Sequence, residues 1–314
     1  MKKLTRIIGC SLLAAMAVLP QVVKAEYPQA PVTFIVPFPP GDLEDVLTRI
    51  IAEEMTKETG YSATVKNIPG DVGVVGATEV WKAPADGSMI GSFVSDLLSV
   101  SILTKSAPWD EQAFEPLGIF LDYPFVIAAK ASAPYNTLQE LATYSQSNDV
   151  SLGHFGYQAS PTAMTFQAAD RLGIKFSSNS AFDATDCSIL ESGQVDVINT
   201  TTQLVMDCLQ SGDIKILVSF TSTRISLAPN SQTMDEAAGI PISIWNGLFV
   251  RTGTPDEVKQ RITEIAKKAL RSDEVQRIAN ETGAGIYWQD AESAKMRIQE
   301  ELFLSQQLLK YLQQ

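Results

Sequence analysis

The chain has 314 residues, of which 45% are hydrophobic, and it carries 24 Lys and Arg against 36 Asp and Glu, a formal net charge of −12 at pH 7. Nucleic acids and anionic membrane surfaces are bound by basic patches, so this balance argues against both as partners. The length fits two lobes of ordinary size better than a single domain.

The N-terminus has the pattern of a cleavable signal peptide. Basic residues at positions 2, 3 and 6 precede an apolar stretch from Ile7 to Leu19, and Val23-Lys24-Ala25 places small residues at the cleavage positions. We expect residues 1–25 to be removed before Glu26, which leaves a periplasmic protein. Its net charge is then −16, because that segment holds four basic residues and no acidic one. The alternative is a lipoprotein anchored at Cys10, although an Ile7-Ile8-Gly9-Cys10 lipobox would leave almost no apolar region before the cysteine.

Strand and helix patterns alternate along the first third of the chain. In order, we expect a strand over 32–37, a helix ending at Gly60, a strand over 63–66, a helix over 77–82 and a strand over 89–94. The next stretch, 106–116, contains proline and is expected to be irregular.

The alternation resumes at residue 125 and continues almost to the end. Strands are expected over 125–129, 150–152, near 174, and over 195–198 and 214–220, with helices over 137–144, 162–172, 185–191, 203–210, 255–270, 273–281 and from 290 onward. Such alternation predicts an α/β protein with parallel sheets covered by helices. Two α/β lobes are the simplest arrangement.

Two cysteines, Cys187 and Cys208, remain after cleavage, in an oxidising compartment. We expect them to form a disulfide that joins two successive helices of one lobe. The alternative is a pair of buried free thiols. Two cysteines and a distant His154 do not make a zinc site, and no metal or other cofactor is expected.

Three loops that join a strand to a helix are the candidate binding elements: 37–45, 67–76 and 153–161. Free N–H groups at a helix start bind anions, and the aromatic residues of the third loop could cover an apolar ligand. Structural alternatives exist for each polar side chain. Asp42 or Asp45 would cap a helix, and His154, also a candidate general base, would make a structural hydrogen bond.

Ordered segments carry a resemblance over nearly the whole chain after residue 26. They are Ile35-Val36-Pro37-Phe38-Pro39-Pro40-Gly41, Asn67-Ile68-Pro69-Gly70, Ala83-Pro84-Ala85-Asp86-Gly87, Ser192-Gly193-Gln194-Val195-Asp196 and Trp245-Asn246-Gly247-Leu248-Phe249. With these, the chain resembles the substrate-binding proteins of tripartite tricarboxylate transporters, the TctC or Bug family.

The resemblance implies a type II periplasmic-binding-protein fold, in which two lobes, each a mostly parallel sheet flanked by helices, are joined by two crossovers. We expect lobe 1 over 26–123 and 223–314 and lobe 2 over 124–222, although the second crossover could lie as late as Trp245. Family members commonly bind organic carboxylates through loop amides and ordered waters. The corresponding ligand-binding positions here are Phe38, Pro40, Gly41, Asp42, Asp45, Asn67, Gly70, Asp71, Gly73, Ser92, Ser95, His154, Gly156, Tyr157, Ser160, Phe182, Asp183 and Thr185.

Acidic residues replace or join the small residues of the family loops. Asp42, Glu44 and Asp71 stand in two of these loops, and Asp96 follows the third strand. A desolvated carboxylate facing a ligand carboxylate is unfavourable unless a proton or a cation intervenes. These side chains either point to solvent or favour a ligand with a cationic part, such as an amino acid, or a neutral heteroaromatic acid derivative.

We therefore expect a monomeric solute-binding protein without catalytic residues. It would capture a small carboxylate, an amino acid or a heteroaromatic acid by lobe closure and deliver it to permease subunits in the membrane. Two alternatives stay open: a ligand-binding partner of a membrane histidine kinase, and a periplasmic hydrolase, for which no nucleophile elbow or HExxH motif is present.

Overall fold

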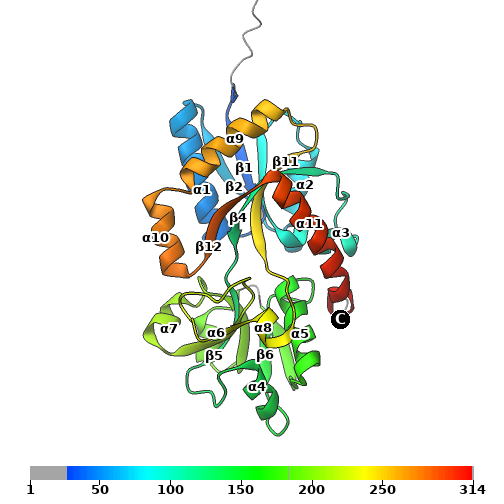
Figure 1. Ribbon diagram of the computed structural model, residues 1–314, viewed down its shortest axis with the longest axis vertical. Coiled ribbons are helices and arrows are strands. Elements are labelled where there is room, and N and C mark those ends of the chain that lie inside the picture. Colours follow the sequence, from blue (N-terminus) through cyan, green and yellow to red (C-terminus); the bar gives the residue numbers. More distant parts are fainter. Residues whose placement is uncertain (1–26, 183, 313–314) are drawn as a thin grey trace, which may run out of the picture.

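The computed structural model describes residues 27–182 and 184–312. Two six-stranded sheets lie in separate lobes, one above the other in Figure 1, and helices flank each sheet. This arrangement confirms the two-lobe α/β fold. The expected signal peptide, residues 1–25, lies outside the described residues.

Lobe 1, the upper lobe of Figure 1, has the strand order β12-β4-β11-β3-β1-β2. Its strands are β1 (Val32–Val36), β2 (Ala63–Asn67), β3 (Met89–Val94), β4 (Phe114–Asp122), β11 (Trp245–Arg251) and β12 (Gly285–Asp290). Its helices are α1 (Leu43–Thr59), α2 (Val74–Lys82), α3 (Val100–Leu103), α9 (Asp256–Ala269), α10 (Asp273–Thr282) and α11 (Ala291–Ser305), with the 3-10 turns η1 (Asp71–Gly73) and η2 (Ser95–Leu97).

Lobe 2 has the strand order β10-β9-β5-β8-β6-β7. Its strands are β5 (Phe125–Lys130), β6 (Ser151–His154), β7 (Ser178–Ala181), β8 (Val197–Thr201), β9 (Ile214–Ser219) and β10 (Gln232–Thr233). Its helices are α4 (Leu138–Tyr144), α5 (Ser160–Leu172), α6 (Cys187–Glu191), α7 (Met206–Ser211) and α8 (Met234–Ala238).

Both sheets are mixed, with more antiparallel pairing than the alternation of the sequence predicts. β1 is parallel to β2 and β3, and β6 is parallel to β7 and β8. By contrast, β11 is antiparallel to β3 and β4, and β5 is antiparallel to β8 and β9. The reason is that β5 and β11 each arrive from the other lobe at the C-terminal ends of the parallel strands. They therefore run through the sheet in the opposite direction.

Many helix ends and strands lie where the sequence predicts them, but several elements do not. Gly60 (φ 74°) and Gly173 (φ 75°) end α1 and α5 in left-handed backbone, as predicted. The strand expected near Ile174 lies at 178–181 instead, and Ile174 packs into the core of lobe 2. The sequence did not lead us to expect β4, which begins inside the stretch expected to be irregular, nor β10, β11, β12, α3 or α8.

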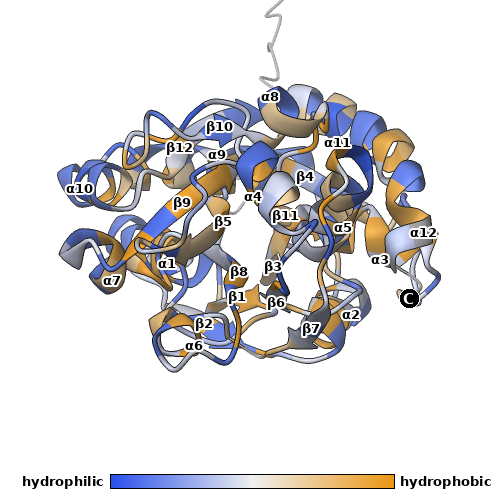
Figure 2. Cartoon of the chain, turned by 90° about the horizontal axis from the view of Figure 1, so that it is seen from below, coloured by the Kyte–Doolittle hydropathy of each residue, from blue (hydrophilic) through white to orange (hydrophobic). Residues whose placement is uncertain are grey.

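Apolar side chains fill both faces of the lobe 1 sheet. Leu47 of α1 and Ile262 of α9 pack on one face, and Phe93 and Phe249 stack on the other with ring centroids 5.6 Å apart. In Figure 2 much of β9 is orange, apolar, whereas α4 and α10 carry blue, hydrophilic stretches. Burial of this apolar surface is the main force that holds each lobe together.

The chain passes between the lobes three times. Tyr123 and Pro124 join β4 to β5, residues 239–244 join α8 to β11, and the chain then leaves lobe 1 again after α11. The last turns, η3 (Gln306–Leu308) and α12 (Leu309–Leu312), lie against α5, and Leu308 and Tyr311 are part of the lobe 2 core. Because β10 also pairs with β9, the segment 223–314 divides between the lobes instead of lying wholly in lobe 1.

The two cysteines form the predicted disulfide. Cys187 of α6 and Cys208 of α7 have Cα atoms 6.1 Å apart and are bonded through their sulfurs. The bond therefore joins two successive helices inside lobe 2.

Candidate ligand-binding site

A hollow of about 610 Å³ lies between the lobes. Lobe 1 contributes the loops that follow β1, β2 and β3, and lobe 2 contributes the start of α5 together with residues near the ends of β7 and β8. Tyr123 and Ile244, one from each of the first two crossovers, complete the wall. Among the described lining residues none is Lys, Arg or His.

The expected ligand-binding residues fall into two groups. Seven of them line the hollow: Phe38, Pro40, Gly41, Asp42, Gly70, Gly73 and Phe182. The others that the structure describes lie behind or beside it: Asp45, Asn67, Asp71, Ser92, Ser95, His154, Gly156, Tyr157, Ser160 and Thr185. Asp183 is outside the described residues.

Asp45 holds the first loop from behind. Its carboxylate accepts hydrogen bonds from the Gly41 N–H (3.0 Å), the Asn67 amide (2.9 Å) and the Arg49 guanidinium (2.9 Å). Burial alone would raise the pKa of Asp45, but these hydrogen bonds outweigh it and hold the pKa below its usual range. The Asn67 amide also donates to the Phe38 carbonyl at 3.0 Å. This network fixes the loop that walls the hollow.

Three acidic side chains line the hollow. Asp42 caps α1, accepting from the Leu43 N–H at 3.1 Å, and the neighbouring Glu44 is only 2% exposed and accepts from the Tyr123 hydroxyl. Burial raises the pKa of Asp42, and burial together with the Asp42 charge raises the pKa of Glu44 to about 8. Asp96, from η2, is the third and is 6% exposed.

Asp96 also joins the two lobes. Its Oδ2 accepts a hydrogen bond from the backbone N–H of Ser160 at the start of α5, at 2.9 Å. Burial raises the pKa of Asp96, although the hydrogen bonds from Ser160 oppose the rise. A carboxylate at a helix start is stabilised by the helix dipole, so this side chain of lobe 1 caps a helix of lobe 2.

The second loop has a strained backbone where it meets the hollow. Asp71 (φ 48°) and Val72 (φ 50°) adopt left-handed conformations between Gly70 and Gly73, and such a conformation is a genuine outlier for a β-branched residue such as valine. Strain of this kind concentrates at ligand-binding sites. The following helix, α2, has no side-chain cap at its N-terminus, and its start faces the hollow through Gly73.

Aromatic rings from both lobes cover the rest of the wall. Tyr123 and Phe125 have centroids 4.9 Å apart, and Phe125 meets Phe155 edge to face at 5.6 Å. Phe38 from lobe 1 and Phe182 from lobe 2 also line the hollow. Phe155 belongs to the third loop, whose aromatic residues were expected to cover an apolar ligand, and it lines the hollow. Tyr123 and Phe125 were not among the expected binding residues, although both lie beside the first crossover.

His154 has a structural place beside the hollow. Its Nδ1 accepts from the Gly156 N–H at 3.0 Å, and its other ring nitrogen lies 3.0 Å from Asn179 Oδ1. Burial lowers the pKa of His154, which favours the neutral ring with its proton on Nε2, donated to Asn179. Tyr157 donates to the same Asn179 oxygen at 2.6 Å. Through Asn179, His154 and Tyr157 fix the conformation of the third loop.

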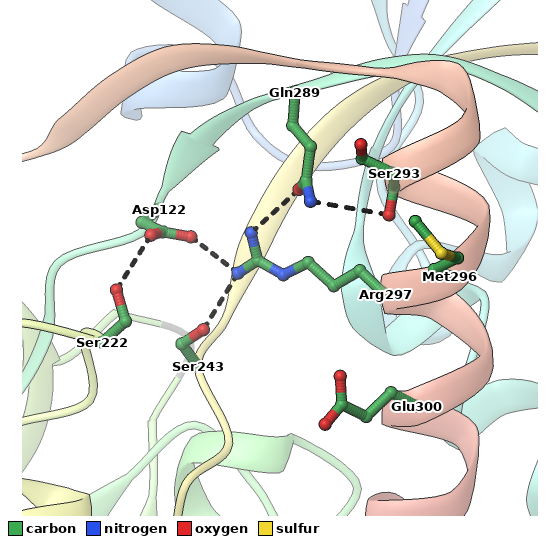
Figure 3. Close-up of a pocket in the computed structure, with 8 residues that line it drawn as sticks. All are labelled: Asp122, Ser222, Ser243, Gln289, Ser293, Met296, Arg297 and Glu300. Atoms are coloured by element: carbon green, nitrogen blue, oxygen red, sulfur yellow. Dashed lines mark hydrogen bonds and ion pairs between the residues drawn. The ribbon is translucent and has the colours of Figure 1, made fainter.

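A second hollow, of about 460 Å³, lies beside the crossovers (Figure 3). Arg297 extends from α11 into it and donates to Asp122 at 2.7 Å, to Ser243 at 2.9 Å and to Gln289 at 3.4 Å. Asp122 ends β4 and Ser243 precedes β11, so Arg297 ties the two crossovers together. Since its guanidinium is paired in this way, we assign this hollow a structural role.

Residues 27–182 and 184–312 contain no group of three or more His, Cys, Asp or Glu that could hold a metal ion. Within the same residues, no helix is both long and apolar enough to cross a membrane.

Comparison with known proteins gives consistent matches over most of the chain. The model of the tripartite tricarboxylate transporter family receptor, TctC, matches residues 47–313. Protein BugT of Bordetella pertussis is 27% identical over 290 residues, which are 88% of this chain and 86% of BugT.

Solved structures match over similar lengths. The periplasmic binding protein BugD has a TM-score of 0.77 and 26% identity, with 91% of this chain and 98% of BugD covered. MatC from Rhodopseudomonas palustris, with bound malate, has a TM-score of 0.77 and 24% identity, with 90% of this chain and 100% of MatC covered.

Proposed function

Because this chain belongs to the tripartite tricarboxylate transporter receptor family, TctC, we propose that it captures a small organic solute between its lobes and delivers it to a membrane permease of that transporter type. The observation that carries the proposal is the hollow of about 610 Å³ walled by both lobes, a size typical of small-molecule sites. MatC was solved with malate. Small carboxylates are therefore the first ligand class to test, beside amino acids and heteroaromatic acids.

The start of α2 is the place where we propose that a ligand carboxylate binds. The dipole of a helix attracts an anion to its start, and no side-chain carboxylate caps α2. The Val74 and Val75 N–H groups themselves donate to the carbonyls of Asp71 and Gly70 in the preceding turn. The strained residues Asp71 and Val72 shape the loop just before it. Binding here needs no basic side chain, in keeping with the absence of one among the described lining residues.

Lobe closure is the proposed mechanism. Asp96 meets Ser160 across the cleft, and Thr202 of lobe 2 donates to the Thr282 carbonyl of lobe 1 at 2.8 Å. A ligand that touches both lobes adds to such contacts and shifts the population toward the closed state. We propose binding without catalysis, by a monomer in the periplasm after cleavage before Glu26.

Binding by the exported, processed protein tests the proposal. A thermal-shift screen with malate, citrate, aromatic acids, amino acids and polyamines, with EDTA as a metal control, identifies a binder. A ligand at 100 times its Kd adds about 2.7 kcal/mol to the free energy of unfolding. The intact mass of the purified protein reports the cleavage position.

Aromatic variants then place the binder in the cleft. Phe38→Ala in lobe 1 and Phe182→Ala in lobe 2 should each weaken binding about tenfold or more, because each ring covers apolar ligand surface. Phe303, 65% exposed on α11, provides the control Phe303→Ala. Binding that both cleft variants leave unchanged would refute the proposed site, and capture by a sensor kinase ectodomain in place of permease subunits would favour the sensory alternative.

A further inference from the structure

Phenylalanine rings from both lobes stay partly exposed in the cleft. Four half-buried phenylalanines line the hollow, one from lobe 1 and three from lobe 2: Phe38, Phe125, Phe155 and Phe182. By contrast, Phe34 in the core of lobe 1 is fully buried. Ring surface left in water is unfavourable, and exposed apolar surface gathered in a hollow is typical of a site for an apolar ligand.

The backbone of the loops fixes two of these rings in place. A Cβ atom at Gly73 would lie 3.1 Å from Phe38 Cζ, and one at Gly153 would lie 3.2 Å from Phe182 Cε2. Each ring therefore rests directly on the main chain of a glycine. Side chains that are already held lose little conformational freedom when a ligand packs against them, so these rings are prepared for binding.

Prolines extend the rigid, apolar wall around the rings. Five of them line the hollow: Pro37, Pro39, Pro40, Pro69 and Pro161. The pyrrolidine ring of proline is rigid, and the negative face of an aromatic ring attracts the C–H edges of neighbouring groups. A wall of rigid rings therefore suits a planar ring better than a flexible chain.

The polar side chains of the wall are already bound within the protein. Five polar side chains line the hollow, and each makes a hydrogen bond to another residue of the chain: Asp42, Glu44, Asp96, Tyr123 and Thr201. None of the described lining residues is basic. A short polyacid such as malate needs a polar partner for every carboxylate oxygen that it buries. The wall therefore favours a ring with few polar groups over a chain of carboxylates.

We propose that the cleft recognises an aromatic ring of its ligand, which packs against Phe38 of lobe 1 and against Phe155 and Phe182 of lobe 2. The inference rests on the proposed solute capture and specifies its ligand class. Because the phenylalanines belong to both lobes, a ligand ring that contacts both of them stabilises the closed state. An aromatic monocarboxylate carries this ring together with the single carboxylate proposed for the start of α2.

Pairs of probes that differ only in ring saturation test the assignment. Benzoate is compared with cyclohexanecarboxylate, and phenylacetate with cyclohexylacetate, so that the charge stays the same and the aromatic ring is lost. Burial of apolar area alone favours the saturated ring, which has the larger surface. Calorimetry with the full processed protein should nevertheless show that in at least one pair the aromatic acid binds about tenfold or more tightly than its saturated partner, and more tightly than malate and citrate.

Leucine variants locate the ring. Phe155→Leu and Phe182→Leu keep an apolar side chain but remove its ring, and each should reduce the preference for the aromatic over the saturated acid about 2- to 10-fold. Phe303→Leu is the matched control, because Phe303 is 65% exposed on α11 and does not line the cleft. A general loss of stability or of closure weakens both acids alike, so the ratio of the two affinities reports the ring contact itself.

A measurement on the wild type tests the proposal even if a variant fails to fold. In deuterated protein that carries protons only on its phenylalanine rings, NMR saturation of these rings should transfer to the ring protons of bound benzoate or phenylacetate. Absence of this transfer from a bound aromatic acid would overturn the ring contact.

The outcomes separate the ring assignment from solute capture. Equal or tighter binding of the saturated acids, tighter binding of malate or citrate, or an affinity ratio that both leucine variants leave unchanged overturns the ring assignment and leaves solute capture intact. If no aromatic probe binds, the ring assignment fails, and if the broader thermal-shift screen is silent as well, solute capture fails with it.

Discussion

Glu301 offers a direct test of the electrostatics at the boundary of the lobes. It is 7% exposed on α11, accepts from the Trp245 indole N–H, and lies near the charged groups of Asp96 and Arg297. Burial raises the pKa of Glu301 from 4.5 to about 8. Between those two values the folded state keeps a proton that the unfolded state has lost, so the free energy of unfolding should fall as pH rises.

The size of the effect follows from proton linkage. One extra bound proton in the folded state gives a slope of about 1.4 kcal/mol per pH unit. Glu301→Gln removes that proton difference. Its unfolding free energy should therefore decline less steeply than that of the wild type between about pH 5 and pH 8, by about 1.4 kcal/mol per unit.

Urea unfolding at pH 5, 6, 7 and 8 provides the measurement, with Glu300→Gln as the control. Glu300 is the preceding residue of α11 and is exposed, so its variant should keep the wild-type slope. If Glu301→Gln and the wild type lose stability in parallel across this range, the buried, protonated state of Glu301 is refuted.

Three further predictions concern stability. Replacing Cys187 and Cys208 by serine opens a loop with a sequence separation of 21 and should lower the free energy of unfolding by about 3 kcal/mol; coincident urea midpoints for the variant and the wild type would contradict this. Val72→Gly relieves a left-handed valine (φ 50°) and should raise the free energy of unfolding by about 1 kcal/mol, whereas a loss measured by urea unfolding would show that the valine side chain contributes more than its strain. Leu308→Ala removes a fully buried side chain of the lobe 2 core and should lower the free energy of unfolding by about 2–5 kcal/mol; a negligible loss in the same assay would indicate that the C-terminal turns do not pack stably on α5.

Much of the fold could be predicted from local features of the sequence. The helix ending at Gly60 and the strand over 89–94 were predicted at their observed positions because each depends on its own residues: a left-handed glycine in one case and a short, largely apolar segment in the other. The disulfide was predicted from the compartment and the even number of cysteines, and it is confirmed. The resemblance to the TctC family is confirmed by the match over residues 47–313.

Features that depend on distant partners could not be predicted in the same way. Strand β12 is only partly buried and pairs with β4 across more than 160 residues, so its sequence has no strong apolar run. The third passage between the lobes depends on the packing of Leu308 and Tyr311 in the core of lobe 2. The spacing of apolar residues in a helix does not indicate which lobe that helix packs against.

The candidate site likewise combines local features, which the sequence predicts, with contacts between distant residues, which it does not. The loops that wall the cleft were recognisable as strand-to-helix turns. The roles of their side chains were not, because Asp45 faces Arg49 and Asn67 behind the loop while Asp42, three residues earlier, lines the cleft. The inter-lobe contact of Asp96 with Ser160 joins positions 64 residues apart, and its existence follows only from the assembled fold.

The C-terminal turns on α5 change how the two halves of the molecule can move. Two neighbouring crossovers alone would leave the lobes free both to bend and to twist about each other. A third attachment, set to one side of them where the chain ends in Figure 1, restrains the twist. The motion left to the lobes is then mainly a bending about the crossovers, which is the motion that opens and closes the cleft.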